Sequence, residues 1–211
     1  MSLVALTLFV HSVGSVGEAA KKFLQNFQSF RGELSGSNNS RGNQVRCSKW
    51  SPPEQGNYKA NFDGAMFGES DEAGIGIMVM DYMGQVVSAM AEKILKPHSV
   101  DSLEMLAARR AVIFASEIGL QQCQFEGDSE TVIKAIKGCD LLHSSIGHKV
   151  KDTLIFVNPF RSSSFSHLVR QGNTVTHALS QRARISFPLL IWMKSIPLDV
   201  DAYVCADLSV F

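Results

Sequence analysis

The hydrophobic pattern of the chain changes its period near residue 99, and this change constrains the fold more than any other feature. From residue 57 to residue 94, apolar positions alternate with polar ones or form short unbroken runs, which is typical of strands. From Ser99 to Gly119, apolar residues recur every three or four positions, which is typical of an amphipathic helix. The sequence therefore predicts neighbouring strands followed by a helix that covers their apolar face.

Turn signals between the apolar segments divide the rest of the chain into short elements. The first three strands are expected as an antiparallel meander at residues 57–65, 74–81 and 85–94. The later elements are expected as a strand at 122–127, helices at 129–137 and 145–156, a strand at 163–170 and a helix at 174–186. Ser99 or Asp101 would cap the helix that follows the meander, and Gly119 would end it. This order of elements indicates an α/β domain with a mixed sheet.

The composition before the first strand differs from that of the rest of the chain. Residues 18–30 have the pattern of a short amphipathic helix, and a stretch rich in Gly, Ser and Asn follows them. Pro52 and Pro53 then disfavour helix in the residues before them. We therefore expect a flexible N-terminal extension over residues 1–47 and a single domain over 48–211, whose apolar, proline-broken tail packs back on the domain.

Composition excludes several classes of protein. Hydrophobic residues make up 45% of the chain, which argues against global disorder. The four cysteines form no CxxC pair, so neither a disulfide scaffold nor a zinc site is indicated. No run reaches the roughly 18 apolar residues that span a bilayer, and the apolar start lacks a basic segment. We expect no membrane partner, and the cytoplasm or nucleus as location.

The charge balance limits how the chain can bind nucleic acid. Lys plus Arg and Asp plus Glu both number 20, so the formal net charge is zero. Proteins held on nucleic acid mainly by phosphate contacts are usually basic. Any such binding here must come from a local patch or from metal ions. A nucleotide cofactor is not expected either, because Gly74-Ile75-Gly76 lacks the third glycine of a dinucleotide loop.

Three acidic residues lie where carboxylates are costly. Asp63 is near the end of the first strand, Glu104 is in the first turns of an apolar helix, and Asp128 is at a boundary between strand and helix. Each has an ordinary explanation, because Asp63-Gly64 suits a turn, Glu104 suits a helix N-terminus and Asp128 suits a helix cap. The residues alone leave these alternatives open for each acid.

Five segments and the tail carry a resemblance to a known family. The segments are KWSPPEQGNYKANFDGA, GIGIMVMD, SLEMLAARRAV, FEGDSETVIKAI and HLVRQGNTVTHALSQRA, and the tail is IWMKSIPLDV. Together they resemble type 1 ribonuclease H, and most closely the plant ribonuclease H-like domain of reverse-transcriptase-like and retroelement-derived proteins. The resemblance covers about residues 48–208. It implies a five-stranded mixed sheet, with three antiparallel strands followed by two parallel ones, flanked by helices.

The resemblance also implies a chemistry. By motif position, Asp63, Glu104 and Asp128 would bind divalent metal, usually Mg²⁺ with Mn²⁺ as an alternative, and support hydrolysis of the RNA strand of an RNA–DNA hybrid. Magnesium is a hard cation that prefers oxygen ligands. Two such ions about 4 Å apart can activate a water and stabilise the leaving oxygen. A neutral protein could hold a polyanion through these ions.

The chain departs from the family at the fourth acid. That acid lies about one turn after a motif asparagine, which is Asn173 here, and the matching catalytic position is His177. Histidine is a softer ligand that could orient a water or bind manganese, or it could have no ligand role. The loop before Asn173 is short and lacks a histidine, since His167 belongs to the preceding strand.

The remaining candidates are polar residues that would line the groove for nucleic acid, namely Asn61, Ser129, Arg170 and Asn173. Arg170 is the nearest cation to the acids and is expected to contact phosphate. Three functions remain open from the sequence. The first is a metal-dependent hybrid endonuclease, the second is a nucleic-acid-binding module that cleaves weakly or not at all, and the third is a retroelement relic or interaction domain. We expect a monomer in each case.

Overall fold

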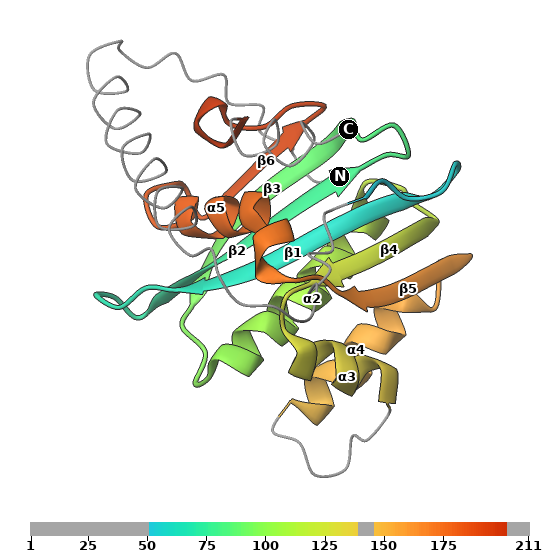
Figure 1. Ribbon diagram of the computed structural model, residues 1–211. Coiled ribbons are helices and arrows are strands. Elements are labelled where there is room, and N and C mark those ends of the chain that lie inside the picture. The colour runs from blue at the N-terminus through green and yellow to red at the C-terminus, as the bar shows by residue number, and fades with distance from the viewer. Residues whose placement is uncertain (1–50, 139–145, 202–211) are drawn as a thin grey trace, which may run out of the picture. The chain divides into compact units, whose positions relative to one another are not determined.

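Helices cover both faces of a six-stranded sheet in the part of the chain that the computed structural model describes, residues 51–138 and 146–201 (Figure 1). The strands are β1 (Tyr58–Met66), β2 (Glu72–Met80), β3 (Val86–Leu95), β4 (Gln122–Gly127), β5 (Ser162–His167) and β6 (Leu189–Met193). The helices are α2 (Val100–Glu117), α3 (Glu130–Gly138), α4 (Gly147–Val157) and α5 (Thr174–Arg182), with a 3₁₀ turn, η1, at Arg170–Gly172. The extension predicted over residues 1–47 lies outside the described residues.

The strand order β5-β4-β1-β2-β3-β6 confirms the predicted mixed sheet and adds one strand to it. β1, β2 and β3 pair antiparallel as a meander, while β4 pairs parallel with β1, and β5 parallel with β4. The expected count of five strands is wrong, because residues 189–193 of the apolar tail form β6 and pair antiparallel with β3. The tail thus extends the sheet at the β3 edge instead of only packing against it.

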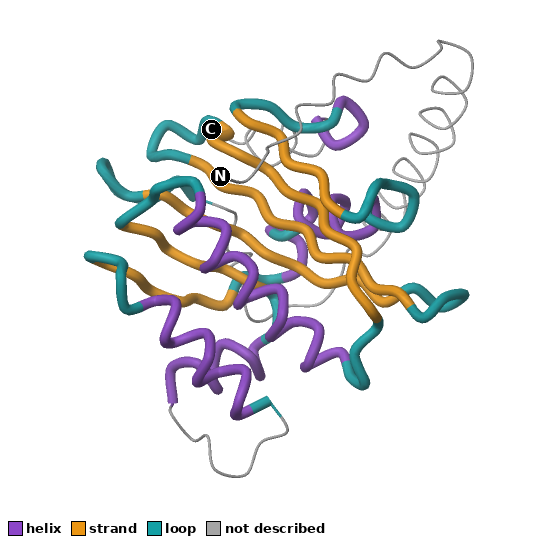
Figure 2. The backbone as a smooth tube through the Cα atoms, turned by 180° about the vertical axis from the view of Figure 1, so that it is seen from behind, coloured by secondary structure: helices purple, strands orange, loops and turns teal. Residues whose placement is uncertain are grey.

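The two faces of the sheet carry different helices. α5 lies across β1, β2 and β3 on one face, and α2, α3 and α4 lie on the other, as the views from the front and from behind show (Figures 1 and 2). Because side chains alternate along a strand, Ala60 and Phe62 of β1 enter the main core beneath α2. Asp63 points the other way and meets side chains of α5.

Glycines let the helices approach the central strands closely. A Cβ at Gly76 would lie 2.5 Å from the backbone nitrogen of Ser180, and one at Gly74 would clash with the Ser180 carbonyl oxygen, so α5 rests directly on β2. On the opposite face, a Cβ at Gly64 would lie 2.5 Å from Cγ of Leu103 in α2. Real Cβ atoms do not come this close to other atoms, so a side chain at Gly74 or Gly76 would push α5 off the sheet, and one at Gly64 would displace the Leu103 side chain.

Local capping fixes where the helices near the acids begin and end. The Ser99 hydroxyl accepts a hydrogen bond from the Ser102 amide at 3.1 Å, and Gly119, at φ +83°, follows the end of α2, as predicted. The Ser129 hydroxyl accepts from the amide of Val132 at 3.3 Å and so caps α3. Glu104 therefore lies in the second turn of α2, and Asp128 lies between β4 and the α3 cap.

The tail is held by backbone and side-chain contacts around β6. The amide of Lys93 donates to the carbonyl of Pro188 at 2.7 Å, and the amide of Lys194 donates to Val87 at 2.9 Å, one at each end of the new pairing. The guanidinium of Arg182 in α5 lies 5.9 Å from the ring centre of Trp192. These contacts join β6 to both β3 and α5.

Among the described residues, no helix combines the length and the apolarity that crossing a membrane requires.

The contact between α5 and β2 predicts a large effect of one added methyl group. Gly76→Ala should lower the free energy of unfolding by about 1–3 kcal/mol or more, because its Cβ meets helix backbone that cannot move aside alone. Urea denaturation followed by circular dichroism measures this change. Gly68→Ala is the matched control, since its Cβ would meet nothing within 4 Å. Equal stability of the two variants would contradict this account of the packing.

Candidate active site

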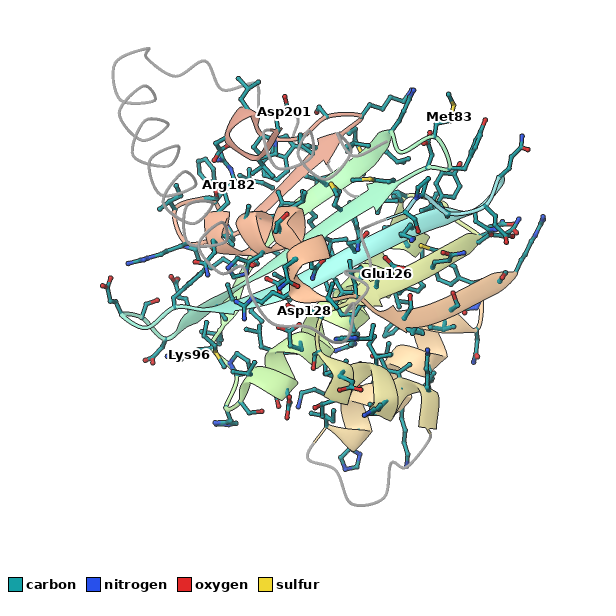
Figure 3. All side chains as sticks on the ribbon, viewed as in Figure 1. Met83, Lys96, Glu126, Asp128, Arg182 and Asp201 are labelled. Carbon is teal, nitrogen blue, oxygen red and sulfur yellow. The ribbon has the colours of Figure 1, made fainter. Side chains whose placement is uncertain are left out.

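The structure brings together the three acids that the sequence singled out. Asp63 lies inside β1 opposite Gly76 of β2, Glu104 comes from α2, and Asp128 directly follows β4. One oxygen from each carboxylate lies within 4.8 Å of those of the other two. Figure 3 shows Asp128 at the end of β4, beyond Glu126 of the same strand. Three elements that are distant in sequence thus direct carboxylates to one point.

The ordinary explanations for Asp63 and Asp128 do not hold. β1 continues to Met66, so Asp63-Gly64 is not a turn but part of a paired strand. Ser129, not Asp128, supplies the oxygen that caps α3. Glu104 does lie near a helix N-terminus, but its side chain is turned into the protein and only 6% of the residue is exposed. The positions of all three acids are better explained by their meeting than by local structure.

Burial and mutual repulsion make this cluster costly to ionise. Burial raises the pKa of Glu104 to about 9, and the negative charges of Asp63 and Asp128 add to the effect. A backbone hydrogen bond from Gly64 and the positive charge of Arg170 act in the opposite direction. Without a cation, Glu104 is therefore protonated at neutral pH.

Asp128 is subject to the same forces but is less enclosed. Burial raises its pKa above the ordinary value, and the charge of Asp63 raises it further. The charges of Arg170 and His177 lower it. Arg170 and His177 therefore lie close enough to the cluster to affect the ionisation of Asp128.

The cluster fits a divalent cation such as Mg²⁺. Oε2 of Glu104 is buried and has no hydrogen-bond partner among the described residues, which is costly for a carboxylate oxygen. A cation bound between the three carboxylates would satisfy this oxygen and offset the repulsion that raises the pKa of Glu104. The donor set consists of oxygen atoms alone, which suits hard cations and not zinc.

His177, at the position of the expected fourth acid, contacts Asp63 instead of joining the cluster. Its Nδ1 lies 2.9 Å from Oδ2 of Asp63, and 40% of its side chain is exposed. Among the described residues, the group of mutually close ligand atoms contains the three acids and not His177. The hydroxyl of Ser180, three residues further along α5, donates to the same Oδ2 at 2.8 Å.

The four predicted groove residues have different surroundings. Arg170 is exposed at the rim of the cluster, where its charge acts on Glu104 and Asp128. Asn173 is buried, and its amide donates to the carbonyl of Phe62 at 2.9 Å, which ties α5 to β1 beside Asp63. Contact of these residues with nucleic acid stays a prediction.

The other two groove candidates also have partners within the protein. The Asn61 amide is buried and donates to Oε2 of Glu126 at 3.5 Å. Ser129 is occupied as the cap of α3. Both residues therefore have structural contacts that the sequence did not indicate, and Arg170 is the most accessible of the four candidates.

Two residues beside the cluster, Ser180 and His167, were not predicted from the sequence to belong to the site. Ser180 follows His177 by three positions, a spacing that places both on one helix face, but a serine in a helix gives no signal of its own. His167 does not lie in the loop before Asn173, yet its Nε2 is 3.1 Å from the backbone carbonyl of Asp128. Its pairing in β5 opposite Gly127 brings it there.

Comparison with known sequences identifies the class of protein. Residues 61–183 match the reverse transcriptase-like family, which covers more than half of the chain. The chain therefore belongs to the reverse transcriptase-like family, with the ribonuclease H-like fold, and the predicted resemblance to type 1 ribonuclease H is confirmed. The plant origin stays a prediction. No curated protein sequence matches the chain.

Solved structures with this fold include several ribonucleases H. The chain is similar to ribonuclease H1 from the halophilic archaeon Halobacterium salinarum, with 25% identity and a TM-score of 0.57 over 62% of this chain and 98% of that one. LC11-RNase H1, solved in complex with an RNA/DNA hybrid, is 19% identical with a TM-score of 0.54 over 61% and 99%. The N-terminal ribonuclease H domain of Rv2228c from Mycobacterium tuberculosis is 18% identical with a TM-score of 0.54 over 60% and 92%.

The raised pKa of Glu104 predicts how stability depends on pH without metal. Between pH 4.5 and about 9 the unfolded chain ionises at Glu104 while the folded protein keeps the proton, so this group makes stability fall as pH rises. Glu104→Gln should remove that loss and be more stable than the wild type at pH 8, by on the order of a few kcal/mol. Urea denaturation in a chelator at pH 5 and pH 8 measures it.

The control for this experiment is Glu54→Gln, which changes an exposed glutamate before β1. It should leave the pH dependence of the wild type unchanged. A Glu104→Gln variant whose stability falls between pH 5 and pH 8 as steeply as that of the wild type would contradict the assignment of the raised pKa to Glu104.

Proposed function

We propose that the protein hydrolyses the RNA strand of RNA–DNA hybrids at a divalent-cation centre formed by Asp63, Glu104 and Asp128. The observation that carries this proposal is the convergence of three carboxylates within 4.8 Å, with Oε2 of Glu104 buried and unpaired among the described residues. Such an arrangement is unfavourable by itself and becomes favourable with a cation. Membership of the reverse transcriptase-like family supports the reaction class.

Each acid has a distinct task in this proposal. Asp63 is fixed in the sheet and held by two donors from α5, so its carboxylate has a defined orientation. Glu104 would hold the cation in its ionised form, because the charge of a bound cation would outweigh that of the neighbouring acids. Asp128 is the most accessible of the three acids, so it is the one that solvent and a substrate can reach most readily. Bound Mg²⁺, or Mn²⁺ in its place, would supply activation of the attacking water and stabilisation of charge on the leaving oxygen.

The family and the charge of the site support the proposed substrate class. LC11-RNase H1, which shares the fold, has been solved with an RNA/DNA hybrid. Because the net charge of this chain is zero, we expect the cation centre and the nearby Arg170 to provide the attraction for the phosphate backbone. Selection of RNA over DNA would come from contacts to the 2′-hydroxyl and from the shape of the hybrid's minor groove.

A specific observation also favours a second candidate function. His177 hydrogen-bonds Asp63 and does not join the cluster, so the centre has three carboxylates where the family pattern has four. A centre with less negative charge holds its cations more weakly. The second candidate is therefore a module of the same fold that binds hybrid and cleaves it slowly or not at all.

A cleavage assay on labelled RNA–DNA hybrid with Mg²⁺ or Mn²⁺ tests the first proposal. We expect RNA cleavage by the wild type, and a loss of about 100-fold or more in Asp63→Asn, since that change removes a charge that holds the cation. Asp152→Asn is the control, because it alters an exposed aspartate on α4. His177→Asp should increase the rate if the fourth position limits activity.

The outcomes separate the two candidates. Folded wild-type protein that cleaves no hybrid at any concentration of either metal would exclude the first function. Hybrid binding in that same protein, unchanged in Asp63→Asn, would then support the binding module. Absence of both cleavage and binding would exclude both candidates.

The exposure of Arg170 beside the acids predicts a phosphate contact. Arg170→Gln should weaken hybrid binding several-fold and lower the dependence of the affinity on salt by about one ion equivalent. Fluorescence anisotropy at a series of salt concentrations measures both quantities. Arg161→Gln is the matched control, because Arg161 is also exposed but directly precedes β5, at the end of the strand away from Arg170. Equal effects of the two substitutions would show that Arg170 contributes only general charge.

A further inference from the structure

The two carboxylate oxygens of Asp63 have different environments. Oδ2 receives the hydroxyl of Ser180 at 2.8 Å and Nδ1 of His177 at 2.9 Å. No hydrogen bond reaches Oδ1 from any residue in the ranges 51–138 and 146–201. The helix side of the carboxylate is thus satisfied by protein donors, and the other oxygen is left for a partner of a different kind.

Ser180 lies in a tightly packed part of the interface between α5 and β2. It is fully buried, and its backbone rests on β2 where Gly74 and Gly76 leave no room for a Cβ. A shift of its backbone away from Asp63 would require α5 to move on the sheet. Packing therefore fixes the backbone from which the hydroxyl projects, so that only a rotation of the side chain is needed for it to donate to Asp63.

The single proton of the Ser180 hydroxyl has two acceptors within reach. One is Oδ2 of Asp63 and the other is the backbone carbonyl of His177, also at 2.8 Å. An ionised carboxylate is the stronger acceptor. The proton is therefore directed to Oδ2 of Asp63, and the hydroxyl holds that oxygen on the side of α5.

We propose that Ser180 is a positioning residue for the cation centre, which it serves by holding Oδ2 of Asp63 and thereby presenting Oδ1 as the ligand oxygen. His177 supports the same oxygen from the more exposed side through Nδ1. The inference rests on the proposed function, since it concerns the cation centre on which that function depends. In this proposal α5 orients a cation ligand, Asp63, and does not itself supply a ligand to the cation.

Ser180→Ala isolates this role, since it removes one oxygen atom and leaves a residue that suits a helix. Ser88→Ala is the matched control, because Ser88 is also fully buried and its hydroxyl donates to a backbone carbonyl, that of Trp192, at 2.8 Å. Both variants lose one buried hydroxyl. Urea denaturation in a chelator should show similar, small losses of stability in the two.

The decisive measurement is cation affinity in the absence of nucleic acid. Titration calorimetry with Mg²⁺, and electron paramagnetic resonance with Mn²⁺, report binding to the full chain without any cleavage step. We expect Ser180→Ala to raise the dissociation constant by about 10-fold or more, and Ser88→Ala to leave it unchanged. Ser180→Cys, which keeps a weak donor, should fall between Ser180→Ala and the wild type.

The possible results distinguish this inference from the proposed function. Ser180→Ala with wild-type cation affinity, or with a loss no larger than that of Ser88→Ala, would overturn the role of Ser180 and leave the proposed function intact. A wild-type protein that binds neither cation would overturn both. An increase in the dissociation constant confined to Ser180→Ala and, in smaller measure, Ser180→Cys would support the inference.

Discussion

The close contact of two helices with the central strands is the constraint on which the site depends. Gly76 and Gly74 bring α5 onto one face of β2, and Gly64 brings α2 onto the other face of β1. Glu104 reaches Asp63 because α2 is so near to β1, and Ser180 reaches it because α5 is so near to β2. Residues without a side chain thus determine where the chemically active side chains meet.

The resulting cluster stores an electrostatic cost that the protein only partly offsets. Arg170 and His177 reduce the repulsion at Asp128, yet the pKa of Glu104 remains raised to about 9 and one of its oxygens lacks a donor among the described residues. The arrangement that suits a cation therefore lowers the stability of the protein when no cation is bound. The protein bears this cost within a well-packed core, which tolerates a local loss.

How much the sequence predicted depends on the range of the interactions involved. The meander and α2 followed from local periodicity, whereas the grouping of Asp63, Glu104 and Asp128 was implied by the resemblance to ribonuclease H. β6 was missed because pairing of residues 189–193 with β3 is non-local, and a five-residue apolar run gives no such signal. The orientation of His177 and the donor role of Ser180 depend on how closely α5 sits on β2, which no short pattern encodes.

The late position of α5 and β6 in the chain has a consequence for folding during synthesis. Met78 and Met80 of β2 form a cluster with Val175 and Leu179 of α5, which the ribosome makes much later. The nascent meander therefore exposes apolar surface and an open β3 edge until the last elements emerge. Such surfaces invite chaperone binding or association between chains. The order of synthesis thus separates in time the two halves of one apolar cluster.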